Sequence, residues 1–441
     1  MNAGGTKTFY IGGPFRNTQR GKLSGMQVNR RNFLAGAAAS AASLGAATTQ
    51  KAKRVKAPSL AEIDRAAALP VLKRDGLTSP VIIDSIRLLK KDKDHFIHIR
   101  SKDGAEGIAL VNESRGDYIA PLLHGNLTPF LKGKDARDWD NLLWEIYRYK
   151  DNYKLYGLLF WSAQASVEFA VLDMLGRIAR KPIGAMVGDV IRHEIPFYIA
   201  SGRRDTTPEQ EIDYLRMLVD KSGARAIKFR LGGRMSRNAD AMPGRTTTLI
   251  PLVRKSFGDA MVIHADANSS YDPPEAIKVG KLLESVKAIH YEEPCQFDHL
   301  EQNKEVSDAL DIRVALGEQE YSDWRFRWIV ANRAVDIVQP DLFYYGGIVR
   351  SMRVARMAAL AKMSTTVHLS GGFGFVYVLH FASCVPDIGP YQEYKLGLER
   401  YGNWFDPVIA VKDGKLSVPT APGVGITDLK GLLSGASEVR T

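Results

Sequence analysis

Three acidic residues recur at an even spacing in the second half of the chain. Asp266 ends the run VIHAD, Glu292 follows 26 residues later, and Glu318 follows after another 26 residues. Each closes a short apolar run rich in β-branched residues, and each precedes a stretch of helical length and composition. Because one strand, one helix and two loops take roughly 20–30 residues, this spacing is typical of repeated β/α units. The sequence therefore predicts a parallel barrel in which neighbouring strands end in these three carboxylates.

The same spacing continues with different chemistry. Asp341, His368 and Glu393 lie in the next three strand-like runs, at steps of 23, 27 and 25 residues. Active sites of β/α barrels lie at the carboxyl ends of the strands, so we expect all six side chains in one pocket. An aspartate next to a histidine can hold the imidazole in one tautomer, which makes His368 the candidate general base.

The three evenly spaced carboxylates also predict a cofactor. Carboxylate oxygens without a thiolate partner suit a hard cation, so we predict Mg²⁺ bound by Asp266, Glu292 and Glu318. Such a cation stabilises the negative charge that develops when a proton leaves the carbon next to a substrate carboxylate. Lys228 and Arg230 are two residues apart in the run AIKFRL and therefore point to the same side of one strand. We expect them to face a small, negatively charged substrate.

The remaining sequence predicts a fold of the α/β class with more than one part. Eight strand-like runs alternate with helical segments over 195–395, which indicates a parallel barrel. Residues 80–110 predict an antiparallel meander, and 138–150 and 161–180 have helical periodicity, so 80–194 is expected to form a separate α+β domain. Residues 51–79 are expected to be an irregular linker. Residues 396–441 are expected to form a C-terminal segment that contains a hairpin and returns to the α+β domain.

The net charge of +11 does not indicate a nucleic-acid partner. Residues 1–56 contain ten Lys or Arg and no Asp or Glu, which leaves fifty basic and 49 acidic residues in the other 385. The body of the protein is therefore nearly neutral, and charge gives no support to phosphate binding. Two cysteines, Cys295 and Cys384, are too few for a disulfide framework or a thiolate metal site.

Residues 1–50 predict an export signal. The run NRRNFL at 29–34 precedes an Ala-rich stretch over 35–47, which resembles a twin-arginine signal with small residues suitable for cleavage. An Ala-rich helix after a basic tail is the alternative, and the stretch is too short to span a membrane. We therefore expect a periplasmic protein whose precursor binds the export machinery, with Met1 or Met26 as its start.

Together, these residues and their order resemble the enolase superfamily, specifically its mandelate racemase-like subgroup. The resemblance extends from about Val81 to Ile426 and includes WSAQASVEFAVLDMLGRIARKPIGAMVGD ahead of the barrel. It implies a modified TIM barrel, (β/α)₇β, with an N-terminal α+β capping domain, and Mg²⁺ that stabilises an enediolate. It also implies a homo-oligomer. The implied roles are metal ligands for Asp266, Glu292 and Glu318, a dyad for Asp341 and His368, an acid for Glu393 and a substrate contact for Asn268.

One departure from the subgroup's pattern bears on the reaction. The second strand of the subgroup usually carries Lys-x-Lys, and the second lysine is a base on one face of the substrate. This chain has Lys228-Phe229-Arg230, and an arginine stays protonated. With His368 as the one suitable base, the resemblance implies dehydration of a sugar acid (an aldonate or aldarate) to a 2-keto-3-deoxy acid.

Several alternatives stay open at this point. A racemase or epimerase of a 2-hydroxy acid and a catalytically silent binding or sensing protein are the alternative functions. Arg230 either contacts substrate or pairs with a ligand carboxylate. Glu399 competes with Glu393 for the position on the eighth strand.

Overall fold

The computed structural model describes residues 56–112, 115–368 and 371–440. The chain divides into two units, Met1–Thr48 and Thr49–Thr441. The predicted export signal over 1–50 lies outside the described residues.

Eight parallel strands form the predicted barrel. Neighbouring strands pair in chain order from β4 to β10, and β11 pairs with β4 on its other side. The backbone of Thr365 in β10 donates to Asp387 O at 3.1 Å and accepts from Gly389 N at 2.7 Å, just ahead of β11, which closes the ring. The strands are β4 (Glu194–Ala200), β5 (Ala226–Arg230), β6 (Val262–Asp266), β7 (His290–Glu292), β8 (Arg313–Leu316), β9 (Ile337–Val338), β10 (Ser364–Thr365) and β11 (Gln392–Tyr394).

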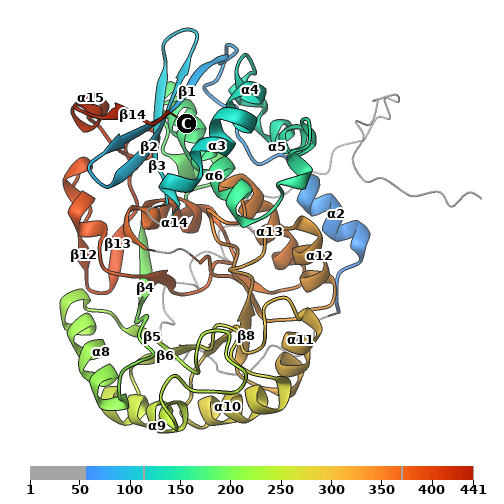
Figure 1. Cartoon of the computed structure of the whole chain (residues 1–441), viewed down its shortest axis with the longest axis vertical. Helices are drawn as coiled ribbons and strands as arrows, with labels where there is room; N and C mark the ends of the chain where they lie inside the picture. Colours follow the sequence, from blue (N-terminus) through green and yellow to red (C-terminus); the bar gives the residue numbers. More distant parts are fainter. Residues whose placement is uncertain (1–55, 113–114, 369–370, 441) are drawn as a thin grey trace, which may run out of the picture. The chain divides into compact units, whose positions relative to one another are not determined.

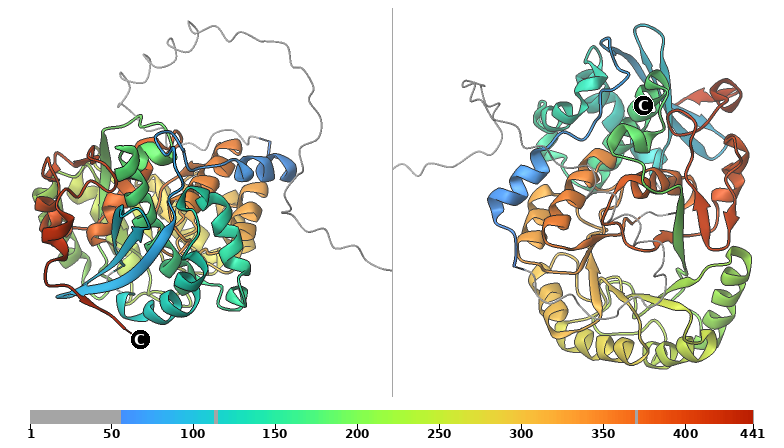
Figure 2. Two further views of the ribbon diagram at one scale, coloured as in Figure 1. Left: turned by 90° about the horizontal axis from the view of Figure 1, so that it is seen from above. Right: turned by 180° about the vertical axis from the view of Figure 1, so that it is seen from behind.

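Helices connect these strands and lie outside the ring (Figure 1), and Figure 2 shows the same arrangement from behind. Each strand from β4 to β10 is followed by one main helix before the next strand begins, which is the predicted β/α alternation. These helices are α8 (Pro208–Ser222), α9 (Arg245–Phe257), α10 (Pro273–Ser285), α11 (Leu300–Ala309), α12 (Asp323–Ala331), α13 (Ile348–Leu360) and α14 (Phe375–Cys384).

Alternation along each strand decides which side chains enter the barrel. In β5, Ile227 and Phe229 belong to the large apolar core, whereas Ala226 belongs to a small separate cluster with Tyr198 and Ala200. Because successive side chains point to opposite faces of a strand, Lys228 and Arg230 share the face of Ala226. The barrel interior is therefore polar at the carboxyl end of this strand.

The predicted meander forms an antiparallel sheet of β1 (Ile83–Lys91), β2 (Asp94–Ser101) and β3 (Glu106–Leu110). Strand β14 (Ser437–Glu438) pairs with β1, so the end of the chain joins this sheet. The hairpin of β12 (Val411–Lys412) and β13 (Lys415–Ser417) pairs with β4 instead. Short helices complete this part of the chain: α3 (Ala120–Leu122), α4 (Thr128–Leu131), α5 (Trp139–Arg148), α7 (Ile183–Val187) and α15 (Leu429–Leu433).

Helix α6 (Leu158–Ala179) connects the sheet of β1–β3 to the C-terminal segment. It is the one helix of the described chain that is long and apolar enough to cross a membrane, but 89% of its most apolar window is buried inside the protein. The Asp173 carboxylate on α6 accepts from Ile108 N in β3 at 2.8 Å and from Val424 N at 2.7 Å. Helix α6 is therefore a core helix that holds two distant chain segments together.

The prediction of an irregular linker over 51–79 is wrong for part of that range, because residues 60–68 form helix α2 (Leu60–Ala68). Ser59 and Glu62 cap its start reciprocally, each side chain bonding the other residue's backbone N–H. Ile63 is buried, and Asp64 pairs with Arg327 of α12 at 2.6 Å. This helix forms because it buries an apolar face against the barrel helices.

Candidate active site

The structure brings the predicted site residues together at the carboxyl ends of the barrel strands. Asp266 ends β6, Glu292 ends β7, and Glu318 lies two residues beyond β8. Asp341 and His368 follow β9 and β10 and form a parallel bridge with each other. All of the predicted residues are buried: Asp266, Asn268, Glu292, Glu318, Asp341, His368, Glu393, Lys228 and Arg230.

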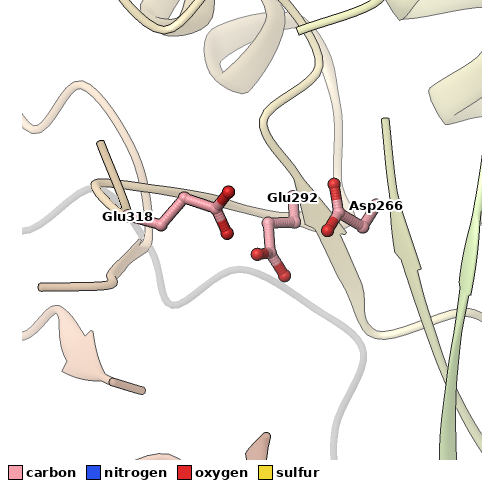
Figure 3. A group of neighbouring side chains, drawn as sticks. All are labelled: Asp266, Glu292 and Glu318. Atoms are coloured by element: carbon pink, nitrogen blue, oxygen red, sulfur yellow. The ribbon is translucent and has the colours of Figure 1, made fainter. Parts of the chain in front are cut away.

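The carboxylates of Asp266, Glu292 and Glu318 lie close enough to share one ion. One oxygen of each lies within 4.8 Å of the others. Figure 3 shows the carboxyl groups of Asp266 and Glu318 on either side of Glu292. Glu292 Oε1 is buried and has no hydrogen-bond partner within the described part of the chain. Three hard oxygen donors and an unpartnered buried oxygen fit a magnesium ion, whose ligand preference is carboxylate and water.

The pKa values around these carboxylates indicate a negative potential. Burial and the neighbouring Glu318 and Glu292 carboxylates raise the pKa of Glu293 well above its usual value. Burial opposes a charge on His368, but Glu318, the hydrogen bond to Asp341 and Glu393 raise its pKa to about 9. A site that disfavours further anions and favours cations is suited to hold a divalent metal ion.

Lys228 is a permanent cation at the centre of the carboxylates. Its Nζ lies 2.7 Å from Glu292 Oε2, 3.1 Å from Glu393 Oε2 and 3.4 Å from Asp266 Oδ2. Burial opposes its charge, but the Glu292 and Glu393 carboxylates raise its pKa. Lys228 therefore stays protonated, offsets part of the negative charge of these carboxylates and is a poor proton acceptor.

Arg230 pairs with a predicted metal ligand, which was one of its two expected roles. Its Nη1 contacts Asp266 Oδ2, and it donates to Asn268 Oδ1 at 3.2 Å and to the carbonyl of Ser201 at 3.1 Å. Burial opposes its charge, but Glu393 and Glu292 raise its pKa. Arg230 therefore stays protonated and balances the Asp266 charge.

Asp341 and His368 have the geometry of a general-base dyad. His368 Nδ1 bonds Asp341 Oδ2 at 2.6 Å, and Asp341 Oδ1 accepts from the backbone N–H groups of Phe343 and Tyr344 at 2.7 Å each. These bonds fix the carboxylate, which in turn holds the ring with its Nδ1 proton toward Asp341. His368 Nε2, 3.3 Å from Glu318 Oε2, then faces the metal ligands.

Glu393, and not its competitor Glu399, lies in this site. Glu399 is exposed and accepts from Tyr394 Oη at 2.7 Å. Glu393 contacts Lys228, and Arg230 Nη2 lies 3.6 Å from its Oε1. Burial would raise its pKa, but Lys228, Lys395 and His368 lower it to about 2, so Glu393 is ionised in this structure.

Three contacts of the site were not predicted from the sequence. His290 Nε2 lies 3.2 Å from Glu292 Oε2, and its position two residues before Glu292 on the same strand face was a usable signal. Arg204, in the loop after β4, donates to Asn268 Oδ1. Arg115 donates to Tyr344 Oη at 3.4 Å from the segment between β3 and α3. The two loop contacts follow no periodicity and left no signal in the sequence.

Comparison with known proteins agrees with this fold. The model of the family described as "Enolase C-terminal domain-like" matches residues 211–428. The chain is 28% identical to an arabinonate dehydratase of Saccharolobus solfataricus over 70% of this chain and 81% of that one. It is 26% identical to an L-talarate/galactarate dehydratase of Salmonella typhimurium over 75% and 79% of the two chains.

The alignment with this chain covers nearly the whole length of two solved structures. A protein of Roseobacter denitrificans described as a candidate racemase is 33% identical, with a TM-score of 0.74, over 81% of this chain and 99% of that one. A mandelate racemase/muconate lactonizing protein of Paracoccus denitrificans, complexed with magnesium, is 26% identical with a TM-score of 0.73 over 82% and 99%. A (β/α)₇β barrel with a capping domain and an acidic triad defines the class. This chain belongs to the enolase superfamily, in its mandelate racemase-like subgroup.

We expect Glu318→Gln to weaken Mg²⁺ binding at least about 100-fold, because one of three ligand carboxylates is lost. Isothermal titration of the purified protein with MgCl₂ measures this. Glu320→Gln is the matched control, since Glu320 is buried two residues away but pairs with Arg325. Equal Mg²⁺ affinity in the Glu318→Gln variant and the control would contradict the ligand assignment.

Proposed function

We propose that the protein is a Mg²⁺-dependent hydro-lyase that dehydrates a sugar acid to a 2-keto-3-deoxy acid. The observation that carries the proposal is the pairing of a complete metal triad with a single suitable base. His368 is held by Asp341 on one side of the site, whereas the position of a second base is occupied by Arg230, which stays protonated. The family's dehydratase relatives are consistent with this chemistry.

The site's own residues orient the substrate. Asp266, Glu292 and Glu318 would hold Mg²⁺, which when bound stabilises the negative charge that develops on a substrate carboxylate. Lys228 adds a fixed positive charge next to the same substrate carboxylate. A substrate anion next to Glu393 raises the pKa of Glu393, because two neighbouring carboxylates resist ionising together, so Glu393 can share a proton with the substrate oxygen.

Proton transfer starts at His368. His368 acts as a base only in its neutral form, so its Nε2 must first lose the proton that Glu318, Asp341 and Glu393 favour by raising its pKa to about 9. Nε2 then accepts the proton on the carbon next to the carboxylate, and the electron pair of that C–H bond moves toward the carboxylate. The pair then forms a C2–C3 double bond while the C3–O bond breaks, and His368 returns its proton to the departing hydroxyl as water. The enol that remains converts to the 2-keto-3-deoxy acid. Asp341 stabilises the imidazolium between the two transfers.

The two alternative functions make different demands on the site. A racemase or epimerase needs bases on both faces of the same carbon, and Arg230 is a poor base. A silent binding or sensing protein needs no dyad, yet Asp341 is fully buried and bonds His368 at 2.6 Å. Dehydration uses both features.

We further propose that the protein works in the periplasm after twin-arginine export, and as a homo-oligomer. The paired arginines at 30 and 31 support the first proposal. Export of a folded chain would deliver the barrel with its metal in place.

A panel of aldonates and aldarates with Mg²⁺, assayed for 2-keto acid formation, tests the function. We expect at least one acid to be dehydrated, and His368→Asn to lower its turnover about 10³-fold or more because the base is lost. Mg²⁺ affinity should change less than about 3-fold, since His368 is not a ligand. The matched control is His299→Asn at an exposed histidine outside the site. Turnover in His368→Asn equal to the control would show that the base is misassigned.

A 2-hydroxy acid that lacks the 3-hydroxyl separates dehydration from racemisation. In D₂O we expect the wild-type protein to exchange the α-proton of one enantiomer only and to retain its configuration, because one face has a base. Arg230→Lys places an ionisable amine on the opposite side. We expect this variant to exchange both enantiomers, which NMR and chiral chromatography measure. Inversion by the wild-type protein would support the racemase instead.

A further inference from the structure

A second cationic region adjoins the metal ligands, on the loop that follows β4. The Arg204 guanidinium there donates to Asn268 Oδ1, which also accepts from Arg230 at 3.2 Å. The Asn268 amide in turn donates to Glu318 Oε1 at 3.4 Å. One amide therefore joins Arg204 to the edge of the acidic triad.

Arg204 forms no ion pair among the residues that the structure describes, although the Glu318 carboxylate is near enough to favour its charge, and its buried Nε has no hydrogen-bond acceptor there. Burial and the neighbouring guanidinium groups of Arg230 and Arg234 lower the pKa of Arg204 to about 9. A guanidinium group crowded by other cations gains strongly from an added anion.

A buried arginine holds this loop in place. Arg245 donates to the carbonyls of Thr206 and Arg230 at 2.8 Å each and to the carbonyl of Arg203 at 3.4 Å. Glu211 lies 3.6 Å from Arg245 Nη2 and balances its charge. The position of Arg204 between two anchored residues is therefore fixed before any ligand binds, which lowers the entropy cost of binding.

The cationic region around Arg204 differs from the one around Lys228. Lys228 is fully buried and contacts Asp266, Glu292 and Glu393, so it serves the carboxylate next to the reacting carbon. Arg204 is half-buried, and Arg234 beyond it is exposed. Positive charge thus continues from the triad toward solvent, where the distal end of a bound sugar acid would lie.

We propose that Arg204, with Arg234 at the rim, binds a second carboxylate at the distal end of the substrate, which makes the substrate an aldarate. This inference rests on the proposed dehydration and specifies which class of sugar acid is the substrate. An aldonate carries a neutral hydroxyl at that end, which can accept one hydrogen bond from Arg204 but brings no negative charge to pair with the guanidinium. Arg204 is a specificity-determining residue and takes no part in proton transfer.

The test compares kcat/KM for six-carbon aldarates with that for aldonates of the same configuration. We expect the wild-type protein to prefer an aldarate, and Arg204→Gln to lower the aldarate-to-aldonate ratio about 10- to 100-fold, mainly through KM. Arg204→Lys should retain part of the preference because it keeps the charge. The matched control is Arg203→Gln, since the Arg203 guanidinium lies 3.5 Å from the Tyr214 ring centroid and should leave the ratio unchanged.

Two results would overturn the proposal. One is a wild-type preference for aldonates or for 6-phosphorylated aldonates, which would exclude a distal carboxylate as the bound group. The other is an unchanged ratio in Arg204→Gln, provided that Mg²⁺ affinity shows the variant to be folded. Either result leaves dehydration intact if water is still lost from some acid, whereas failure of dehydration itself would appear as no 2-keto product from any acid.

Discussion

The structure depends on holding three like charges together in a buried space. One oxygen each of Asp266, Glu292 and Glu318 lies within 4.8 Å of the others, and the three residues are at most 5% exposed. Such a cluster is costly without compensating charge. Lys228 and Arg230 provide part of that charge from the adjacent strand β5, and a divalent cation would provide the rest. The closed barrel makes this arrangement possible because the carboxyl ends of its neighbouring strands lie at the same level.

The pairing of these opposite charges also determines which of the other site residues can exchange a proton. Lys228 and Arg230 are so strongly paired that they stay protonated, which removes them as bases. His368 instead bonds a carboxylate whose second oxygen is already occupied by two backbone N–H groups. Under the proposed function, Lys228 and Arg230 would be fixed cations and His368 the one proton acceptor, which is the arrangement that elimination requires.

Strand periodicity made the barrel and the acidic residues at its strand ends predictable. Repeats of 23 to 27 residues located Asp266 through His368 because each lies at or within three residues beyond a strand end, and Glu393 because it lies one residue before the end of β11. Helix α2 was missed although Ser59 and Glu62 have the spacing of a capping box. The position of Arg204 in the site could not be predicted from the sequence. It depends on Arg245, whose side chain donates three hydrogen bonds to backbone carbonyls up to 42 residues away in the sequence. The sequence left open whether Arg230 pairs with a ligand carboxylate such as Asp266 or contacts substrate, because a sequence does not show how charged side chains are arranged inside a barrel.

Anomalous diffraction from crystals grown with Mn²⁺ as a substitute for Mg²⁺ would locate the metal site. We expect a single strong anomalous peak bonded to one oxygen each of Asp266, Glu292 and Glu318, close to His368 Nε2. A peak bound elsewhere, or no peak while those three oxygens stay within reach of one another, would contradict this expectation.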